Sequence, residues 1–447
     1  MEKIPNELLE CAQALRTGNL TPREYCTQIK HRFDTVEQDI QAFVPEQNRW
    51  DRLEEAVLLL ESRFPDPDRR PPLYGVPVGV KDIFSVDRFE RQAGSTIPSK
   101  ALASPEARTV TQLKDAGGLI LGRTVTTEFA HSDPGPTRNP HNTDHTPGGS
   151  SSGSAASVSA GLCPLALGSQ TIGSVARPAA FCGIVGVKPS YDRISADGVF
   201  PVAPSVDTPG YFTQDVAGAK LAAGVLYTDW KANDEPSNGC TIGAVSGPYL
   251  NQASEVAQEQ FESHVEKLAD AGYELRRVQL VDDIETINAR HQQLVAAEMA
   301  LSHNELYPEH GDQYAQETAE LIENGRTVSI GSVASARAGR KELRERIHER
   351  MEENAIDIIV SPSAPGPAPK GLESTGDPVM NLPWSHSGLP TVTIPASQTD
   401  DGLPLGLQCA GHYGRDEWLL SWCEEIQSIL STSQSWLGRT SACRKCV

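Results

Sequence analysis

The sequence contains no run of about eighteen apolar residues, the length that a membrane-spanning helix needs. Its first residues, MEKIPNELLE, also lack the apolar segment of a signal peptide. We therefore expect a cytoplasmic protein with no membrane partner. Basic residues are scarce relative to acidic ones, 39 against 59, which gives a formal net charge of −20. Such an acidic surface argues against nucleic acid as a partner.

Signs of disulfide and metal chemistry are also weak. The nine cysteines are odd in number and scattered along a 447-residue chain, which is too large to depend on disulfides. We therefore expect reduced thiols. Cys443 and Cys446 form a CxxC pair at the end of the chain, but no second pair lies nearby. A metal site at this position is therefore not expected.

Small residues, by contrast, are concentrated in one stretch, residues 146–190. Ser150 follows the pair Gly148-Gly149, and Ser174 follows Gly173. Glycine lets the backbone approach a ligand closely, as a loop that presents a nucleophile requires. The alternative is a flexible Ser/Gly linker, but linkers lack the apolar residues that interrupt this run and require burial. These residues are Val158, Leu162, Leu165, Leu167, Ile172, Val175, Phe181, Ile184, Val185 and Val187.

Four segments of the chain resemble motifs of the amidase signature family, whose members are serine hydrolases of carboxamides and related C–N bonds. The segments are Gly75 to Asp82, Gly148 to Ser151, Gly173-Ser174, and Ala179 to Pro189. The resemblance is dense from about Leu73 to Gly210 and sparser toward the C-terminus. Several linked motifs in the family's order are far more specific than any one of them alone.

The resemblance implies a triad of Ser174 as nucleophile, Ser150 as proton relay and Lys81 as base, with no metal and no cofactor. It also implies a cis peptide bond at the relay serine. The expected oxyanion donors are the backbone N–H groups of Thr171, Ile172, Gly173 and Ser174. The residues expected to contact the substrate are Gly149, Ser151, His131, Gln170, Trp384 and His386.

The residues themselves agree with a lysine base. A serine hydroxyl needs a base to remove its proton, and none of the eleven histidines lies in the stretch 146–190. Lys81 ends a β-branched segment, 74–80, that predicts a buried strand. Burial lowers a lysine pKa, and each unit below about 10.4 needs roughly 1.4 kcal/mol of unfavourable solvation. A lysine in this position more often pairs with a neighbouring carboxylate, here Asp82, so the catalytic role depends on the downstream motifs.

Three positions depart from the family pattern. Gln170 stands where the family usually has Asp, Ile172 stands where it has Gly, and Arg177 lies three residues after the nucleophile instead of two. Gln170 with a single glycine before Ser174 resembles the branch that includes allophanate-type hydrolases. Arg177 either pairs with a substrate carboxylate or forms a structural salt bridge, and we favour the structural role.

Residues 149–153 also match GxSxG, the nucleophile elbow of α/β-hydrolases, with Ser151 in the central position. That elbow requires a strand immediately before it. Here the turn-forming run 139–147 precedes the motif. We therefore expect Ser151 to form hydrogen bonds within the relay network instead of acting as the nucleophile.

The resemblance implies an α/β fold with a large central mixed β-sheet flanked by helices on both sides. We expect one domain over residues 1–447, made of N-terminal helices (1–65), the signature core (70–215), a variable helical cover (255–355) and the C-terminal part of the core (356–430). Periodicity predicts helices at 6–16, 21–36 and 52–61, the second opened by a capping box at Thr21 and Glu24. Further strands are predicted within 117–127, 357–360, 391–394 and 402–408, and a closing helix at 416–430.

We expect the chain to hydrolyse a C–N acyl bond in a small molecule and to act as a monomer or homodimer. The bond would belong to a carboxamide, an aryl amide, a carbamate (urethane) or a urea-like compound. One alternative is an amidotransferase component that acts on aminoacyl-tRNA, which shares this chemistry. The other is a non-catalytic scaffold that binds a small ligand.

Overall fold

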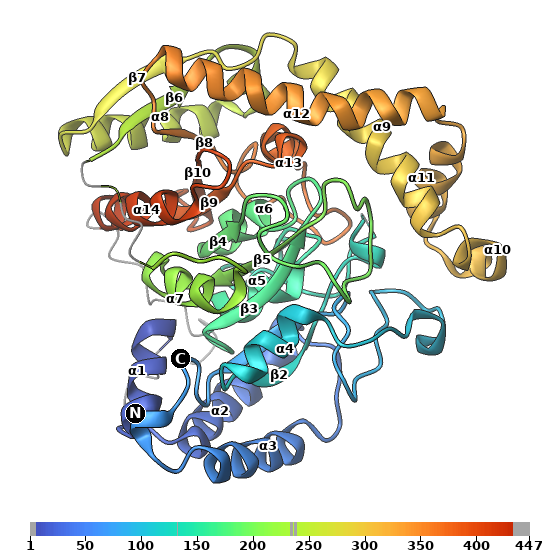
Figure 1. Cartoon of the computed structure of the whole chain (residues 1–447), viewed down its shortest axis with the longest axis vertical. Coiled ribbons are helices and arrows are strands. Elements are labelled where there is room, and N and C mark those ends of the chain that lie inside the picture. The colour runs from blue at the N-terminus through green and yellow to red at the C-terminus, as the bar shows by residue number, and fades with distance from the viewer. Residues whose placement is uncertain (1–5, 132, 233–235, 237–238, 432–447) are drawn as a thin grey trace.

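The computed structural model describes residues 6–131, 133–232, 236 and 239–431. Three helices open the chain and lie together at the bottom of Figure 1: α1 (Leu8–Thr17), α2 (Pro22–Ile40) and α3 (Arg49–Arg63). The predicted capping box is confirmed, because Thr21 Oγ accepts from the Glu24 N–H while the Glu24 carboxylate accepts from the Thr21 N–H. The start of this helix could be predicted from the sequence because its capping interactions involve residues only three positions apart.

A ten-stranded mixed sheet runs through the middle of the molecule, in the order β2-β1-β3-β5-β4-β9-β10-β8-β6-β7. Strand β1 pairs in parallel with β2 and β3, whereas β5 is antiparallel to both β3 and β4. The bounds are β1 Pro77–Lys81, β2 Leu119–Thr124, β3 Leu165–Gln170, β4 Val185–Lys188, β5 Thr208–Thr213, β6 Thr241–Val245, β7 Glu274–Val278, β8 Ile358–Pro362, β9 Thr391–Gln398 and β10 Pro404–Ala410.

Helices flank this sheet in two groups. Helices α5 (Ser152–Ser159) and α6 (Ala176–Cys182) touch each other and pack on β3, β4, β9 and β10. Helices α7 (Val216–Leu226) and α14 (Asp416–Ser431) also touch each other and pack on β5 and β9. The predicted α/β fold with a large, helix-flanked mixed sheet is therefore confirmed.

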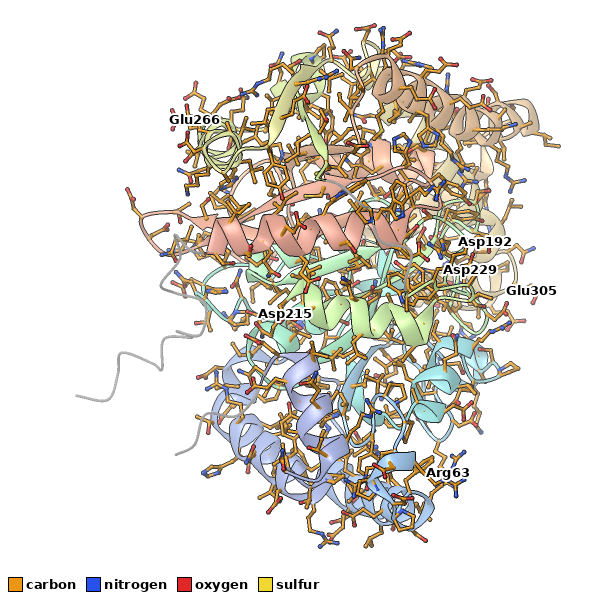
Figure 2. All side chains as sticks on the ribbon, turned by 60° about the vertical axis from the view of Figure 1, so that its left-hand side comes forward. Arg63, Asp192, Asp215, Asp229, Glu266 and Glu305 are labelled. Carbon is orange, nitrogen blue, oxygen red and sulfur yellow. The ribbon has the colours of Figure 1, made fainter. Side chains whose placement is uncertain are left out.

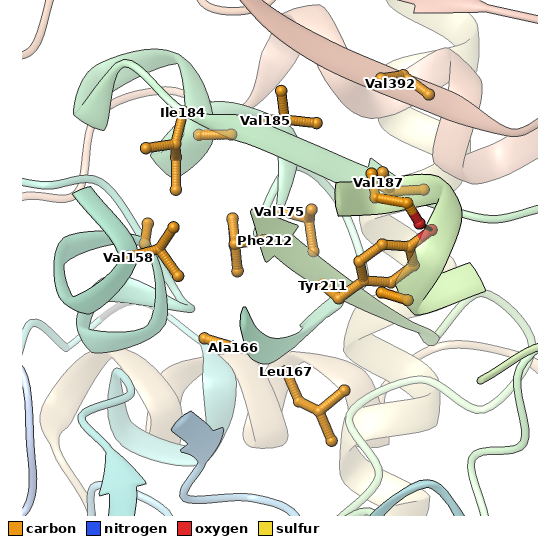
Figure 3. Close-up of a cluster of buried hydrophobic side chains, with 14 of the residues drawn as sticks. Val158, Ala166, Leu167, Val175, Ile184, Val185, Val187, Tyr211, Phe212 and Val392 are labelled. Atoms are coloured by element: carbon orange, nitrogen blue, oxygen red, sulfur yellow. Dashed lines mark hydrogen bonds between the residues drawn. The ribbon is translucent and has the colours of Figure 1, made fainter. Parts of the chain in front are cut away.

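The apolar residues of the Ser/Gly-rich stretch lie in the core. Figure 3 shows side chains of this stretch, including Val158, Val175 and Ile184, facing Phe212 of β5. All four are at most 1 % exposed. Their burial excludes a flexible linker, since a linker would leave them in water.

The region between the two halves of the core is mainly helical. It contains α8 (Glu255–Asp270), α9 (Ile284–Ser302), α10 (Leu306–His310), α11 (Gln316–Arg326) and α12 (Ile330–Glu353), with α10 and α11 projecting at the right of Figure 1. The Glu128 carboxylate fastens α11 to the core by accepting from the Ala315 N–H at 3.0 Å. The predicted domain ranges stay a prediction.

No helix among the described residues combines the length and apolarity needed to cross a membrane. Acidic side chains stand on several separate elements, as the labels on Asp192, Asp215, Glu266 and Glu305 in Figure 2 illustrate. The cysteines among the described residues are free thiols. Cys443 and Cys446 lie outside the described residues.

Candidate active site

Lys81 ends strand β1 and is fully buried. Its Nζ donates to Ser150 Oγ at 2.7 Å and to Ser169 Oγ at 2.9 Å. Burial lowers its pKa well below the usual 10.5, and the nearby Asp207 carboxylate opposes that shift only in part. The site therefore holds an amine that is more easily deprotonated than an exposed lysine and is bonded directly to two hydroxyl groups.

The neighbouring carboxylate, Asp82, has a different partner. Its Oδ1 accepts from the Arg123 guanidinium at 2.7 Å, and its Oδ2 accepts from the Gln92 N–H at 3.2 Å. Lys81 is therefore not held in an ion pair with Asp82. That alternative from the sequence is wrong, because Arg123 on β2 occupies the carboxylate.

Ser169 is a site residue that the sequence analysis did not identify. It lies on β3, beside β1 in the sheet, and its hydroxyl is the second acceptor for the Lys81 amine. The sequence could have indicated that Ser169 bonds to another polar group, because a serine inside a buried apolar strand must find a hydrogen-bond partner. Its partner became visible only once β1 and β3 were seen to pair.

The relay segment leads into α5. The peptide bond between Gly149 and Ser150 is cis, as the family resemblance implied. Ser151 Oγ donates to the Ser169 carbonyl oxygen at 3.3 Å, which ties this segment to β3. Turns and isolated bridges directly precede Ser151, and the described residues between the end of β2 at Thr124 and Ser151 contain no strand. The GxSxG elbow is therefore excluded, as predicted.

Ser174 lies on the loop that joins β3 to α6. Gln170, the last residue of β3, shapes this loop: its Oε1 accepts from the N–H groups of Val175 and Ala176, both at 2.9 Å. This bond pair caps the first turn of α6. Gln170 thus places a hydrogen-bond acceptor at the start of this helix, and its Nε2 also donates to Ser385 Oγ at 3.0 Å.

The loop has room only for glycine before the nucleophile. A Cβ added to Gly173 would collide with Asn381 Oδ1. Within the described residues, the N–H groups of Ile172, Gly173 and Ser174 donate no hydrogen bond. Three neighbouring backbone donors are thus free, which is the arrangement that an oxyanion needs.

Side chains behind the loop hold its other polar groups. Ser385 Oγ donates to the Ile172 carbonyl oxygen at 2.6 Å, and Thr171 Oγ1 donates to the Asp207 carboxylate at 2.6 Å. In a trans peptide the C=O and N–H point in opposite directions. Fixing the Ile172 carbonyl toward Ser385 therefore turns the Gly173 N–H toward the opposite side.

The two serines of the expected triad are not hydrogen-bonded to each other here. Ser174 is 8 % exposed, and its hydroxyl has no partner among the described residues. Arg177 nevertheless connects their segments, since its Nη2 donates to the Gly149 carbonyl oxygen at 2.7 Å and to Thr375 Oγ1 at 3.0 Å. Hydrogen bonds of catalytic groups often close only when substrate binds.

A cavity of about 200 Å³ adjoins this site. Its wall includes Ser169, the partner of Lys81, and the Asp207 carboxylate that holds Thr171. Most of the remaining lining is apolar, with Ile83, Phe200 and Val202 among its residues. A cavity of this size accepts a small group and not a long chain.

Three residues expected to contact substrate lie on short helices or directly after one. His131 is partly exposed and follows the 3-10 helix η3 (Glu128–Ala130), where its N–H donates to Glu128 O at 2.8 Å. Trp384 and His386 belong to the short helix α13 (Leu382–Ser387) and are at most 1 % exposed. Trp384 Nε1 donates to the Tyr249 hydroxyl at 2.9 Å. A contact of these residues with substrate stays a prediction.

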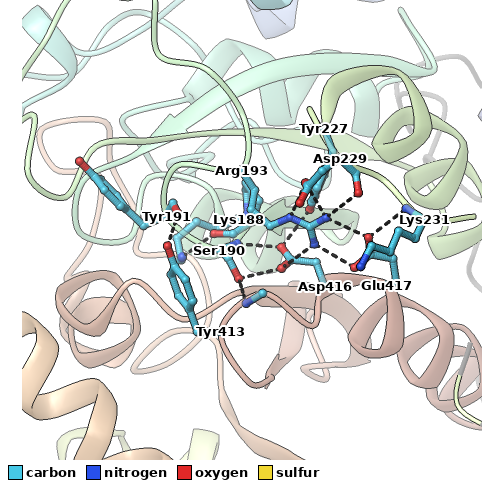
Figure 4. A network of polar contacts seen from close by, with 12 residues as sticks. Lys188, Ser190, Tyr191, Arg193, Tyr227, Asp229, Lys231, Tyr413, Asp416 and Glu417 are labelled. Carbon is cyan, nitrogen blue, oxygen red and sulfur yellow. Dashed lines mark hydrogen bonds and ion pairs between the residues drawn. The ribbon is translucent and has the colours of Figure 1, made fainter. Parts of the chain in front are cut away.

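A second buried lysine, Lys188, has a structural setting. Figure 4 shows it at the end of a network in which Asp416 accepts from the Ser190 N–H and hydroxyl, both at 2.7 Å, and from Arg193 at 3.2 Å. Burial lowers the pKa of Lys188 to about 7, but its Nζ donates to the Pro189 carbonyl oxygen and to no serine that the structure describes. Of these two buried lysines, only Lys81 contacts hydroxyl groups.

The chain matches the family model described as Amidase over residues 24–420. A glutamyl-tRNA(Gln) amidotransferase subunit from Koribacter versatilis is 30 % identical to it, over 81 % of this chain and 86 % of that protein. The protein of the same name from Natronomonas pharaonis is 32 % identical, over 76 % and 92 %.

Solved structures agree in fold. One titled "Crystal structure of amidase" matches with a TM-score of 0.85 and 28 % identity, covering 95 % of this chain and 100 % of that one. A 6-aminohexanoate cyclic dimer hydrolase complexed with substrate matches with a TM-score of 0.83, covering 97 % and 98 %, but at 20 % identity this likeness concerns the fold alone.

These relatives correct one expectation from the sequence. The acidic composition predicts that nucleic acid is excluded, and the chain is expected to act as a monomer or homodimer on a small molecule. Excluding nucleic acid and other subunits as partners is wrong, because relatives of this identity and coverage are named as subunits of a glutamyl-tRNA(Gln) amidotransferase. Net charge sums over the whole surface, so it does not report what one face or an associated chain binds.

Proposed function

Because the chain belongs to the amidase family, whose members cleave C–N bonds, we propose that it cleaves its substrate through an acyl-enzyme on Ser174. Lys81 is the base and Ser150 relays the proton. The observation that carries this proposal is the buried Lys81 amine, which lies 2.7 Å from the Ser150 hydroxyl. A lysine can act as a base only when it is neutral, and burial favours that form.

In the acylation step, neutral Lys81 takes the Ser150 proton while Ser150 takes the Ser174 proton. Ser174 Oγ then bonds to the substrate carbonyl carbon. The resulting oxyanion accepts from the free N–H groups of the loop, which include those of Ile172 and Gly173. The protonated lysine returns its proton through Ser150 to the leaving nitrogen, and the C–N bond breaks.

Water completes the reaction. It loses its proton to Ser150 and Lys81, attacks the Ser174 ester, and releases a carboxylic acid when the proton returns to Ser174. Each proton taken up by Lys81 is thus given back, so no net charge accumulates. The residues that make this cycle are all protein groups, and the proposal uses neither metal nor cofactor.

One observation, the adjoining cavity, bears on the substrate. The adjoining cavity of about 200 Å³ is mostly apolar, which favours a small acyl or leaving group. Carboxamides, aryl amides, carbamates (urethanes) and urea-like compounds all have members of this size.

We place the chain in the cytoplasm, as the sequence analysis expects.

The named relatives favour a second candidate over free hydrolysis. In it, the chain is the amide-cleaving component of an amidotransferase that acts on aminoacyl-tRNA, and the released nitrogen passes to that acceptor. The acylation chemistry on Ser174 is the same. The two candidates differ only in what happens to the nitrogen and in whether the isolated chain turns over.

The test treats one portion of purified chain with phenylmethanesulfonyl fluoride and a separate, unlabelled portion with a panel of primary amides, aryl amides and carbamates. Labelling that disappears in Ser174→Ala but persists in the exposed-site control Ser428→Ala supports an enzyme. Free turnover of any panel member supports the hydrolase. Labelling without turnover supports the amidotransferase component, and absence of labelling overturns both in favour of a scaffold.

A further inference from the structure

Phe200 forms part of the wall of the cavity that adjoins Ser169, the hydroxyl partner of Lys81. Its backbone is fixed, because the Phe200 N–H donates to the Ile83 carbonyl oxygen at 2.8 Å. Ile83 also lines the cavity and follows Lys81 closely in the chain. The position of Phe200 is therefore tied to the segment that carries the proposed base.

Two rings from other parts of the chain pack on the Phe200 ring. The ring centroid of Phe129, in η3, lies 5.2 Å from that of Phe200, and the centroid of His303, directly after α9, also lies 5.2 Å from it. Ring centroids at such separations attract each other beyond the effect of burial alone. Among the described residues that line the cavity are Phe200 but neither Phe129 nor His303. Phe200 thus connects the cavity to these two rings.

Tyr314 holds both of these rings. It stacks on Phe129 with the ring centroids 5.1 Å apart, and its hydroxyl lies 2.8 Å from His303 Nδ1. We call Phe129, His303 and Tyr314 the aromatic cluster. Because His303 follows α9 and Tyr314 precedes α11, the helical region between the two halves of the core supplies two of its three rings.

The backbone of Phe129 is strained in a way that places its ring. Its φ of 46° and ψ of 34° lie in the left-handed region, which is uncommon for a bulky side chain. Such conformations persist only where the surroundings fix them, and they concentrate at functional sites. Here the Phe129 N–H donates to the Ala93 carbonyl oxygen at 2.7 Å, and the side chain is fully buried. The chain therefore accepts an unfavourable backbone in order to keep this ring against Phe200.

We propose that Phe200 determines substrate specificity by limiting the size of the group that enters the cavity, and that the aromatic cluster keeps its ring in place. The inference rests on the proposed function, because it assigns the cavity to the substrate of Ser174. The group that fits is a short, uncharged, apolar substituent of the acyl or the leaving side. A long alkyl chain is excluded, because the Phe200 ring cannot move aside while the cluster holds it.

The buried carboxylate in the cavity wall does not change this preference. Asp207 Oδ1 accepts from Thr171 Oγ1 at 2.6 Å, and its Oδ2 accepts from the N–H groups of Val202 and Ala203 at 2.8 and 2.9 Å. Both oxygens are therefore engaged by the protein. Apolar side chains such as Ile83 and Val202 supply the surface that meets the substrate group.

The test compares kcat/KM for 4-nitrophenyl hexanoate and 4-nitrophenyl acetate in the parent chain, Phe200→Leu and Phe261→Leu. The ratio of the two values is taken from one preparation, so a loss of folded protein cancels. One methylene in an apolar pocket changes kcat/KM by about 10- to 200-fold. We expect Phe200→Leu to raise the hexanoate-to-acetate ratio about 10-fold or more. Phe261, a buried phenylalanine of α8 outside the described cavity lining, is the matched control and should leave the ratio unchanged.

Two further variants test the cavity and the cluster separately. Val202→Leu adds a methylene to a lining residue and should lower the ratio about 10-fold, which gives a result even if Phe200→Leu does not fold. Tyr314→Leu removes a ring of the cluster without touching the described lining, and should raise the ratio by a smaller factor than Phe200→Leu. An unchanged ratio in Tyr314→Leu would mean that the cluster does not hold Phe200.

A second substrate pair, 4-butylphenyl and 4-methylphenyl acetate, varies the leaving side at nearly constant leaving-group acidity. A rise of the hexanoate ratio in Phe200→Leu assigns the cavity to the acyl group, and a rise of the butylphenyl ratio assigns it to the leaving group. No rise in either pair, or an equal rise in Phe261→Leu, overturns the inference, while acetate turnover that is lost in Ser174→Ala leaves the proposed function intact. Absence of such Ser174-dependent turnover in the parent chain removes the proposed function instead.

Discussion

Arg177 anchors the residue before the relay serine: its Nη2 donates to the Gly149 carbonyl oxygen at 2.7 Å. Arg177 lies in α6 and follows Ser174 by three residues, so its buried guanidinium ties the segment after the nucleophile to the segment before the relay serine. Its other acceptors are Thr375 Oγ1 and the Gly376 carbonyl oxygen. All of these oxygens are uncharged, so the structural role expected for Arg177 takes the form of a backbone anchor and not of a salt bridge.

We expect Arg177→Lys to lower both stability and the rate of Ser174 labelling. An ammonium group cannot reproduce the planar fork that reaches Gly149, Thr375 and Gly376 together. The loss in free energy of unfolding should be roughly 2–4 kcal/mol, measured by urea denaturation. Arg326→Lys, at an exposed ion pair with Glu323, is the control and should change stability by less than ~0.5 kcal/mol. Equal effects of the two substitutions would contradict the anchor.

The pH dependence of labelling should report the Lys81 amine. Because burial lowers its pKa below 10.5, the neutral base becomes available as pH rises, and the labelling rate should increase through that depressed pKa. Lys81→Ala should lower the rate by about 10³-fold or more and abolish this rise. Lys188→Met, which removes a buried lysine that bonds to the Pro189 carbonyl oxygen and to neither triad serine, should leave the shape of the profile unchanged. If the labelling rate of Lys81→Ala rose with pH as it does in the parent chain, Lys81 would be excluded as the base.

The same amine should make stability depend on pH with a defined sign. Between the lowered folded pKa of Lys81 and its unfolded value of about 10.4, the unfolded chain binds the additional proton. The contribution of Lys81 to the free energy of unfolding therefore rises with pH in this window. We expect the difference between parent and Lys81→Met, measured by denaturation at several pH values, to shift in favour of the parent as pH increases. A constant difference would mean that the pKa of Lys81 is not lowered.

Gln170 should contribute to stability through its cap on α6. Its Oε1 accepts from two N–H groups at the start of that helix, and removing it leaves both without a partner. We expect Gln170→Ala to cost about 1–2 kcal/mol of unfolding free energy, measured by urea denaturation. Gln316→Ala, at an exposed position of α11, is the comparison and should cost much less. Similar losses at the two glutamines would show that the cap is unimportant.

Local signals made much of the fold predictable. The capping box of α2 and the β-branched segment that becomes β1 depend on neighbouring residues, so the sequence located both. Strands β6 and β7 were not predicted; β7, Glu274–Val278, is an edge strand of charged residues with an exposure pattern unlike that of a buried strand. Its position depends on pairing with β6, which no local pattern encodes.

The residues of the site also fall into two groups, those that local motifs indicated and those that depend on contacts between distant segments. The motifs indicated Lys81, Ser150 and Ser174, and the burial of Lys81 followed from its place at the end of a strand. The second lysine partner, Ser169, and the packing of Phe200 against Phe129 depend on contacts between elements distant in sequence. Only the assembled sheet and helices bring these residues together, so no local pattern indicates their partners.

The most direct test of the account is to trap the acyl-enzyme. Purified chain is mixed with 4-nitrophenyl acetate, whose good leaving group suits any serine acylase, and the release of nitrophenolate is followed while peptide mass spectrometry locates the acetyl group. The account predicts a burst near one equivalent per chain with the acetyl group on Ser174, and no burst in Ser174→Ala. An acetyl group on another residue, or a burst that survives this substitution, would contradict it.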